Sequence, residues 1–161
     1  MSPSEAQPVT AYIALGANLG DARSTVRQAV QALGTLPQTR LVRSSSLYRT
    51  APIDSSGPDY INAVAEVATT LSPQALLTEL QRLEQAAGRE RPYRNAPRTL
   101  DLDILLYGDI TLDTPALTIP HPRMHDRAFV LLPLAEIAPA RVGSDLLQAV
   151  ANQAVKRLIE Y

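Results

Sequence analysis

Two aspartates separated by a single residue, Asp101 and Asp103, lie in the alternating stretch 98–108. In an extended strand, residues two apart point to the same face and lie roughly 6.5–7 Å apart. Neighbouring carboxylates on a rigid element repel each other unless a cation lies between or beside them. Carboxylate oxygens suit Mg²⁺, so the pair is a candidate magnesium site. The alternative is two solvated side chains on an exposed strand face.

Arginines are concentrated in the segment that leads into this strand. The planar guanidinium group pairs bidentately with phosphate, so metal and arginines together suggest phosphate chemistry. A long proline-containing loop beside a carboxylate pair is also the usual place for a mobile lid that excludes water. The alternative is a solvated loop whose arginines pair with Glu79, Glu84 and Glu90. The arginines are Arg82, Arg89, Arg91, Arg94 and Arg98.

Both histidines of the chain, His121 and His125, lie within one five-residue segment. A metal site built on them would need a third ligand, and imidazole suits zinc or iron better than Mg²⁺. We expect one histidine to donate to a phosphate and the other to lie on the surface. Hydrolysis by a Ser-His-Asp triad is not indicated, because the chain has no G-x-S-x-G motif.

Length and composition indicate one globular domain and narrow the range of partners. A chain of 161 residues can bury a real core. The net charge of −1 excludes broad electrostatic attraction to nucleic acid. The absence of cysteine excludes thiolate metal sites and fits a reducing cytosol. No apolar run reaches the roughly 18 residues of a membrane span. Residues 1–8 lack the features of a signal peptide and are expected to be a flexible leader, with 9–161 as a single domain.

Hydrophobic periodicity predicts the first half of the chain to be a strand, a helix and two strands. Strand 9–15 is followed by a glycine-containing loop and by a helix that Asp21 caps and that ends at Gly34. The loop glycines either serve only the turn or help to bind phosphate at the helix N-terminus. Strands are then predicted over 40–50 and 60–71.

The second half begins with a helix from Ser72 to Gly88, which buries a stripe of leucines. In the strand that follows, alternation places Leu100, Leu102, Ile104 and Leu106 opposite Asp101, Asp103, Leu105 and Tyr107. A short hairpin near 108–109, an apolar run over 129–137 and a last helix over 144–159 are expected after it.

This order of elements is βαββαβ, which is typical of a ferredoxin-like fold with helices on one face of the sheet. The last helix is expected to cover the other face. The predicted fold class is therefore α+β, a ferredoxin-like core within a three-layer αβα sandwich, with a mainly antiparallel sheet.

Five blocks of sequence occur in the same order as in a known enzyme family. Together they resemble the 6-hydroxymethyl-7,8-dihydropterin pyrophosphokinases of folate biosynthesis, over most of the chain as far as Pro139. The resemblance implies transfer of pyrophosphate from ATP to the hydroxymethyl group of a reduced pterin, which leaves AMP. It also implies a soluble, cytoplasmic monomer that uses two Mg²⁺ ions. The blocks are residues 14–19, 46–52, 58–62, 97–108 and 119–122.

The same resemblance implies roles for individual residues. Asp101 and Asp103 would hold both magnesium ions, and Arg94 and Arg98 would be catalytic. The pterin pocket would comprise Thr50, Pro52, Tyr60, Asn62 and Phe129. The ATP side would comprise Leu77, Gln81, Glu84, Arg89, Arg91, Arg98, Ile104, Thr118, His121 and Arg127.

Two other functions fit parts of the pattern. A non-catalytic ferredoxin-like module that binds a small ligand would explain the fold, but it has no need of a carboxylate pair beside clustered arginines. A two-metal nuclease would explain the carboxylates. The near-neutral charge and the lack of further acidic residues at suitable positions argue against it.

Overall fold

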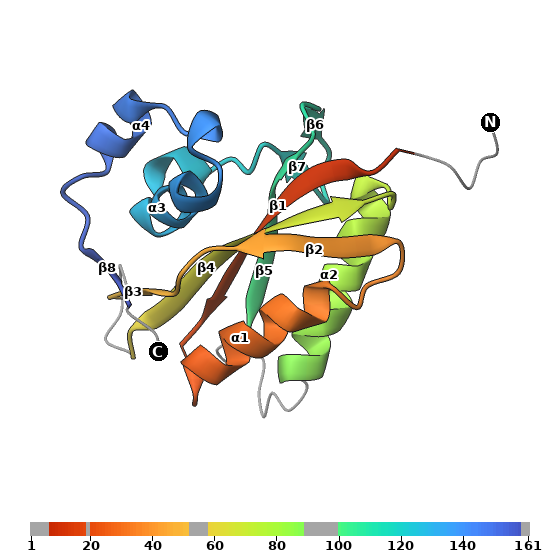
Figure 1. Ribbon diagram of the computed structural model, residues 1–161, viewed down its shortest axis with the longest axis horizontal. Helices are drawn as coiled ribbons and strands as arrows, with labels where there is room; N and C mark the ends of the chain where they lie inside the picture. The colour runs from red at the N-terminus through yellow and green to blue at the C-terminus, as the bar shows by residue number, and fades with distance from the viewer. Residues whose placement is uncertain (1–6, 19, 52–57, 89–99, 159–161) are drawn as a thin grey trace.

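A six-stranded antiparallel sheet forms the middle layer of the molecule (Figure 1). The computed structural model describes residues 7–18, 20–51, 58–88 and 100–158. The strand order is β5-β1-β4-β3-β8, and β2 pairs with the remaining part of β4. The strands are β1 (Val9–Ala17), β2 (Thr39–Ser44), β3 (Tyr48–Thr50), β4 (Tyr60–Thr69), β5 (Asp101–Tyr107) and β8 (Val155–Arg157).

Helices cover both faces of this sheet. Figure 1 shows α1 (Ala22–Leu33) and α2 (Pro73–Gly88) on one side, and α3 (Ala128–Ile137) and α4 (Ser144–Ala149) on the other. The α+β class, the antiparallel sheet and the three layers are therefore confirmed. A small separate sheet pairs β6 with β7, and two short 3₁₀ turns flank α3. These elements are β6 (Leu112–Asp113), β7 (Thr118–Ile119), η2 (Met124–Asp126) and η3 (Pro139–Arg141).

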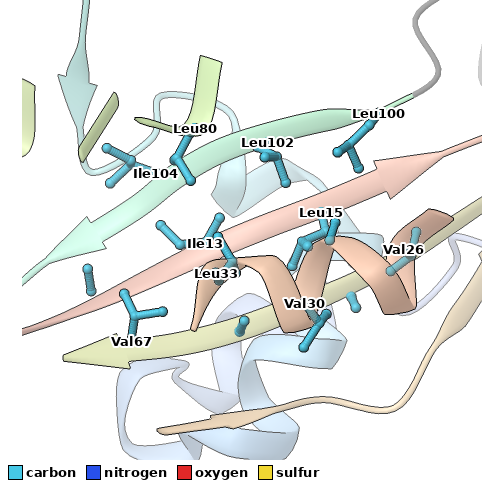
Figure 2. Packing of buried hydrophobic residues seen from close by; sticks show 14 of the residues in the cluster. Ile13, Leu15, Val26, Val30, Leu33, Val67, Leu80, Leu100, Leu102 and Ile104 are labelled. Atoms are coloured by element: carbon cyan, nitrogen blue, oxygen red, sulfur yellow. The ribbon is translucent and has the colours of Figure 1, made fainter. Parts of the chain in front are cut away.

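The face under α1 and α2 has a dense aliphatic core (Figure 2). Val26, Val30 and Leu33 of α1 form a buried stripe and pack on alternate residues of β1 such as Ile13. Asp21 caps α1 as predicted, because its side chain accepts a hydrogen bond from the Ser24 N–H at 3.1 Å. Burial of these stripes fixes which face of each strand points towards the other side of the molecule.

A second core lies under α3. This helix is apolar almost all round, as expected for a buried helix, and Leu131 and Leu134 on it are fully buried. They belong to the same cluster as Tyr12, Val64 and Leu105 of the sheet. None of the helices within the described residues is long and apolar enough to cross a lipid bilayer.

The predicted helix over 144–159 is wrong beyond its first turns. The α-helix ends at Ala149, and Val155–Arg157 instead forms β8 on the edge of β3. An open strand edge leaves N–H and C=O groups unpaired, and pairing with β8 satisfies them. Val150 and Leu158 are still buried, but Ala154, which the helical stripe would also bury, is exposed.

The predicted strand over 40–50 is divided into β2 and β3, which pair with different halves of β4. Ser45 lies at the break, where its hydroxyl accepts from the Val64 N–H at 3.0 Å. The short hairpin expected near 108–109 is formed by β6 and β7, which follow a turn at 108–109.

A β-bulge in β5 corrects one of the predicted faces. Ile104 pairs with Ile13 and Leu106 pairs with Tyr12, so Leu105 is the extra residue. An extra residue reverses the alternation beyond it. Leu106 therefore joins the α3 core, while Tyr107 joins the α1/α2 core, where its hydroxyl donates to the Leu71 carbonyl.

Candidate active site

The site is built on one row of residues that crosses three strands. Gly16 on β1 pairs with Asn62 of β4 on one side and with Asp101 of β5 on the other. In the next row on the same face, Ala14 pairs with Asp103. Since Ile13 and Leu15, which alternate with Ala14 and Gly16 along β1, belong to the α1/α2 core, alternation directs this set to the α3 face.

A cavity of about 310 Å³ opens over this row. Eight of the residues for which a role was predicted line it: Thr50, Tyr60, Asn62, Asp101, Asp103, His121, Arg127 and Phe129. Six lining residues were not among the predicted site residues: Ala14, Leu15, Gly16, Ala51, Leu105 and Val130. The alternation of β1 indicates that Ala14 and Gly16 share a face, but their place beside Asn62 and the two aspartates follows only from the register of the strands.

One end of the cavity carries a buried amide. The Thr50 hydroxyl donates to Asn62 Oδ1 at 3.0 Å, and both side chains are buried. A Cβ atom added at Gly16 would lie 3.1 Å from Asn62 Nδ2. Thr50 therefore sets the orientation of the Asn62 amide, and the absence of a side chain at Gly16 leaves space beside its nitrogen.

A cation and an aromatic ring border the cavity from the start of α3. The guanidinium carbon of Arg127 lies 5.4 Å from the centre of the Phe129 ring, which is cation–π distance. Both side chains are half-buried. They offer a flat apolar surface and a positive charge to the same cavity.

His121 lines the cavity close to the carboxylates, whereas His125 is exposed. The backbone N–H of Arg123 donates to His121 Nδ1 at 3.1 Å. Burial lowers the pKa of His121; the charge of Asp103 opposes this, and Arg127 and Arg123 lower it further. The ring is therefore neutral near pH 7, and because Nδ1 accepts a hydrogen bond, its proton is on Nε2.

The carboxylates fit a magnesium ion that binds together with substrate phosphates. Asp101 is half-buried and Asp103 is exposed at the cavity. Mg²⁺ is usually held by one or two carboxylates, with waters and substrate oxygens completing its shell. The described residues contain no cluster of three or more acidic, histidine or cysteine ligands that would hold a metal by protein groups alone.

The other residues predicted for the ATP side do not line this cavity. Ile104 is buried in the α1/α2 core, Leu77 packs against that core, Gln81 is exposed and Thr118 lies on β7. Glu84 on α2 accepts the Leu102 N–H at 2.8 Å and so covers an edge group of β5. Pro52, Arg89, Arg91, Arg94 and Arg98 lie outside the described residues. Arg82 is on α2, where it pairs with Glu79 at 3.5 Å.

A polar network joins β3 to α3, and both elements contribute residues to the cavity. Glu136 of α3 accepts hydrogen bonds from the Ser46 N–H at 2.9 Å and from the Tyr48 hydroxyl at 2.7 Å. Arg157 of β8 pairs with the same carboxylate at 3.5 Å. Burial, together with the hydrogen bond to Glu136, raises the pKa of Tyr48. The network links β3, which carries Thr50, to α3, which carries Phe129.

Comparison with known proteins decides between the functions that such a site allows. The sequence model of the 7,8-dihydro-6-hydroxymethylpterin-pyrophosphokinase family matches residues 12–139. The chain belongs to this family.

Curated relatives of the family agree with this assignment. A protein of Haemophilus influenzae is 51% identical over 131 residues, which cover 81% of this chain and 82% of that protein. One from Pseudomonas aeruginosa is 45% identical over 154 residues, or 91% of this chain and 95% of that protein. Both are named 2-amino-4-hydroxy-6-hydroxymethyldihydropteridine pyrophosphokinase.

Solved structures of the family have the same fold. An HPPK-DHPS crystallised in complex with substrates superposes with a TM-score of 0.69 at 15% identity, over 91% of this chain and 43% of that chain. Wild-type HPPK-DHPS of Plasmodium falciparum gives a TM-score of 0.64 at 16% identity, over 85% of this chain and 39% of that chain. The chain thus spans about two-fifths of these solved chains. Family membership confirms the resemblance drawn from the sequence and does not favour a non-catalytic module.

Proposed function

We propose that this chain transfers pyrophosphate from ATP to the hydroxymethyl group of 6-hydroxymethyl-7,8-dihydropterin, forming AMP and the pterin diphosphate. Family membership carries the reaction type. The observation that carries the mechanism is the row in which Gly16 separates Asn62 from Asp101 within one cavity. The Asn62 amide, which can hydrogen-bond to a heterocycle, and the aspartates, which suit a metal ion, therefore face the same cavity.

The pterin is proposed to bind at the Asn62 end. The Asn62 amide has both a donor and an acceptor for the edge of the ring, and Phe129 and Tyr60 offer aromatic surface for its faces. Thr50 orients the amide through its hydroxyl. Pro52 completes this pocket by resemblance, although it lies outside the described residues.

The phosphates are proposed to bind at the Asp101 end. Asp101 and Asp103 would hold two Mg²⁺ ions, which supply charge neutralisation and orientation of the reacting oxygens when bound. Arg127 adds a fixed positive charge, and neutral His121 adds an N–H donor. By resemblance, Leu77, Gln81, Glu84, Ile104 and Thr118 contribute to the rest of the nucleotide site, together with Arg89, Arg91 and Arg98.

The reaction needs positioning more than strong acid–base chemistry. An alcohol oxygen attacks the β-phosphorus of ATP, and AMP leaves from the other side. Such transfers depend on alignment and on neutralisation of charge. We therefore expect no covalent enzyme intermediate and no single indispensable general base, with Arg94 and Arg98 as the catalytic cations.

The proposal includes a monomer that acts in the cytoplasm on small molecules rather than on nucleic acid. The near-neutral charge supports the last point. A two-metal nuclease is disfavoured by the family match and by the near-neutral charge of the chain.

The test is release of AMP from ATP, with the pterin and Mg²⁺ each omitted in turn. We expect AMP only when all three are present, and a loss of roughly a thousandfold or more in Asp103→Ala. The matched control is Asp113→Ala, which removes an exposed carboxylate on β6. Near-normal activity of Asp103→Ala would refute the metal assignment, and pterin-independent or absent AMP release would refute the reaction.

A further inference from the structure

Helix α3, which places Phe129 beside the cavity, begins at a residue whose side chain cannot cap it. Arg127 is the N-cap of α3, with φ −122° and ψ 109°, and it makes no side-chain capping hydrogen bond. The first N–H groups of a helix need acceptors, and a guanidinium group has none to offer. A cation is also unfavourable beside the positive end of the helix dipole. The start of α3 therefore depends on a partner from elsewhere in the chain.

Gln153 supplies that partner. Its Oε1 accepts the backbone N–H of Ala128 at 2.9 Å, and its Nε2 donates to the backbone carbonyl of Asp126 at 2.8 Å. The two bonds hold the backbone immediately after and immediately before Arg127. One amide thus uses its acceptor and a donor to fix the residue between them.

Gln153 is itself held in place from the α3 core. Its backbone N–H donates to the carbonyl of Val150 at 3.0 Å, and Val150 is buried among the α3 cluster. The segment lies in the turn between α4 and β8. It is beyond residues 12–139, which match the family model.

We propose that Gln153 is a positioning residue for the Arg127–Phe129 wall of the substrate cavity. Through the two backbone bonds it sets the direction from which Phe129 faces the pterin and Arg127 faces the phosphates. The inference rests on the proposed function for the substrates concerned. Its geometric part concerns only the wall and can be tested without catalysis.

The geometric test uses the fact that the chain contains a single phenylalanine. Incorporation of 4-fluorophenylalanine therefore gives one ¹⁹F resonance, which reports on position 129. We expect this resonance to shift or broaden in Gln153→Ala at temperatures where the protein is fully folded. The matched control is Gln148→Ala, because Gln148 is an exposed glutamine on α4 whose side chain has no hydrogen-bond partner among the described residues.

The functional test compares the kinetic constants of the same variants. Gln153→Ala should raise KM for the pterin and for ATP by roughly five- to tenfold, because a loosened wall must be ordered when the substrates bind. Gln153→Glu keeps the acceptor for the Ala128 N–H and loses the donor to Asp126. It should therefore recover part of the loss, whereas Gln148→Ala should match the parent.

The outcomes separate the two proposals. An unchanged ¹⁹F resonance in Gln153→Ala would overturn the positioning role whatever the activity. A changed resonance with unchanged KM values would overturn it as well, because the wall would then not matter to the substrates. If the parent protein lacks the pyrophosphoryl transfer activity, the proposed function fails, while the resonance still decides whether Gln153 sets the wall.

Discussion

The two faces of the sheet differ in how completely helices cover them. On one face, α1 and α2 lie over a continuous aliphatic core in which Leu33, Leu76 and Leu80 are fully buried. On the other, α3 and the short α4 cover only part of the sheet, and the cavity opens beside them. Both faces belong to the same strands. The difference between them arises because alternate residues of each strand point to opposite faces.

Strand β5 shows what this division makes possible. Leu102 points into the closed core, while its neighbours Asp101 and Asp103 line the cavity. Burial on one side fixes the strand, so that the two carboxylates can be held rigidly on the other. Stability and pterin binding should therefore respond to substitutions on opposite faces, which the following predictions test.

The largest effect on stability is expected on the face of the sheet that α1 and α2 cover. Leu80→Ala should lower the free energy of unfolding by about 3 kcal/mol, because it leaves a cavity among fully buried side chains. The KM for the pterin should stay unchanged at temperatures where the variant is folded. Urea denaturation and steady-state kinetics measure the two quantities, and the half-buried Leu146 of α4, changed to alanine, serves as the milder control. A large rise in KM for the pterin in Leu80→Ala would show that the faces are not independent.

Gly16→Ala, on the face where the cavity opens, is expected to change substrate binding more than stability. The added Cβ would lie 3.1 Å from Asn62 Nδ2, so the amide must shift by a few tenths of an ångström, which disturbs the orientation that its bond with Thr50 sets. We expect KM for the pterin to rise about tenfold with little change in the unfolding transition. At Gly143 an added Cβ meets nothing within 4 Å, so Gly143→Ala is the control. Unaltered pterin binding in Gly16→Ala would mean that the floor of the cavity is not the pterin site.

A smaller effect is expected at Glu136, which links β3 to α3 beside the cavity. Glu136→Gln removes the charge that receives the Ser46 N–H and the Tyr48 hydroxyl, and it should lower the free energy of unfolding by about 1–2 kcal/mol. Chemical denaturation checks this value. Glu79→Gln breaks only a 3.5 Å pair with the exposed Arg82 within one helix and should cost under about 0.5 kcal/mol. Equal costs for the two variants would remove Glu136 as a link between β3 and α3.

The smallest effect is a dependence of stability on alkaline pH. Burial and Glu136 raise the pKa of Tyr48 above its ordinary value near 10. A raised pKa means that the folded state retains the proton, so this stabilisation is complete below about pH 10 and is lost as the pH rises above it. Tyr48→Phe should show a shallower loss of stability between roughly pH 9.5 and 11. A residual slope is expected from Tyr12 and Tyr107, whose pKa values burial also raises. The same slope in both proteins would contradict the assignment to Tyr48.

Sequence periodicity predicted those strands and helices whose own residues alternate, or recur at helical spacing, between polar and apolar types. The faces of β1 and β4 and the stripes of α1 and α2 follow directly from alternation and from helical spacing. Three features depend on partners that are distant in the chain. The partner of β8 is β3, about a hundred residues earlier, which overrides the weak helical pattern there. The bulge at Leu105 and the contact of Gln153 with Ala128 likewise leave no local signal.

The candidate site was predictable to the extent that motifs identify side chains. Asp101, Asp103 and Asn62 stand out by type and by resemblance, and all three line the cavity. The contribution of Gly16 was not named, because the absence of a side chain becomes informative only when the neighbouring strands are in register. The roles of the individual residues stay predictions until the variants are measured.

The row that runs from Asp101 through Gly16 to Asn62 also has a consequence for how the site can vary between related chains. Two strand spacings separate the ends of the row, which is about 10 Å. This length is set by backbone hydrogen bonds between strands and is independent of which side chains fill the core. Core residues can therefore diverge widely without changing the distance between the two ends of the site. A change in that distance would require a strand to be inserted or lost, so the substrate's dimensions are built into the sheet itself.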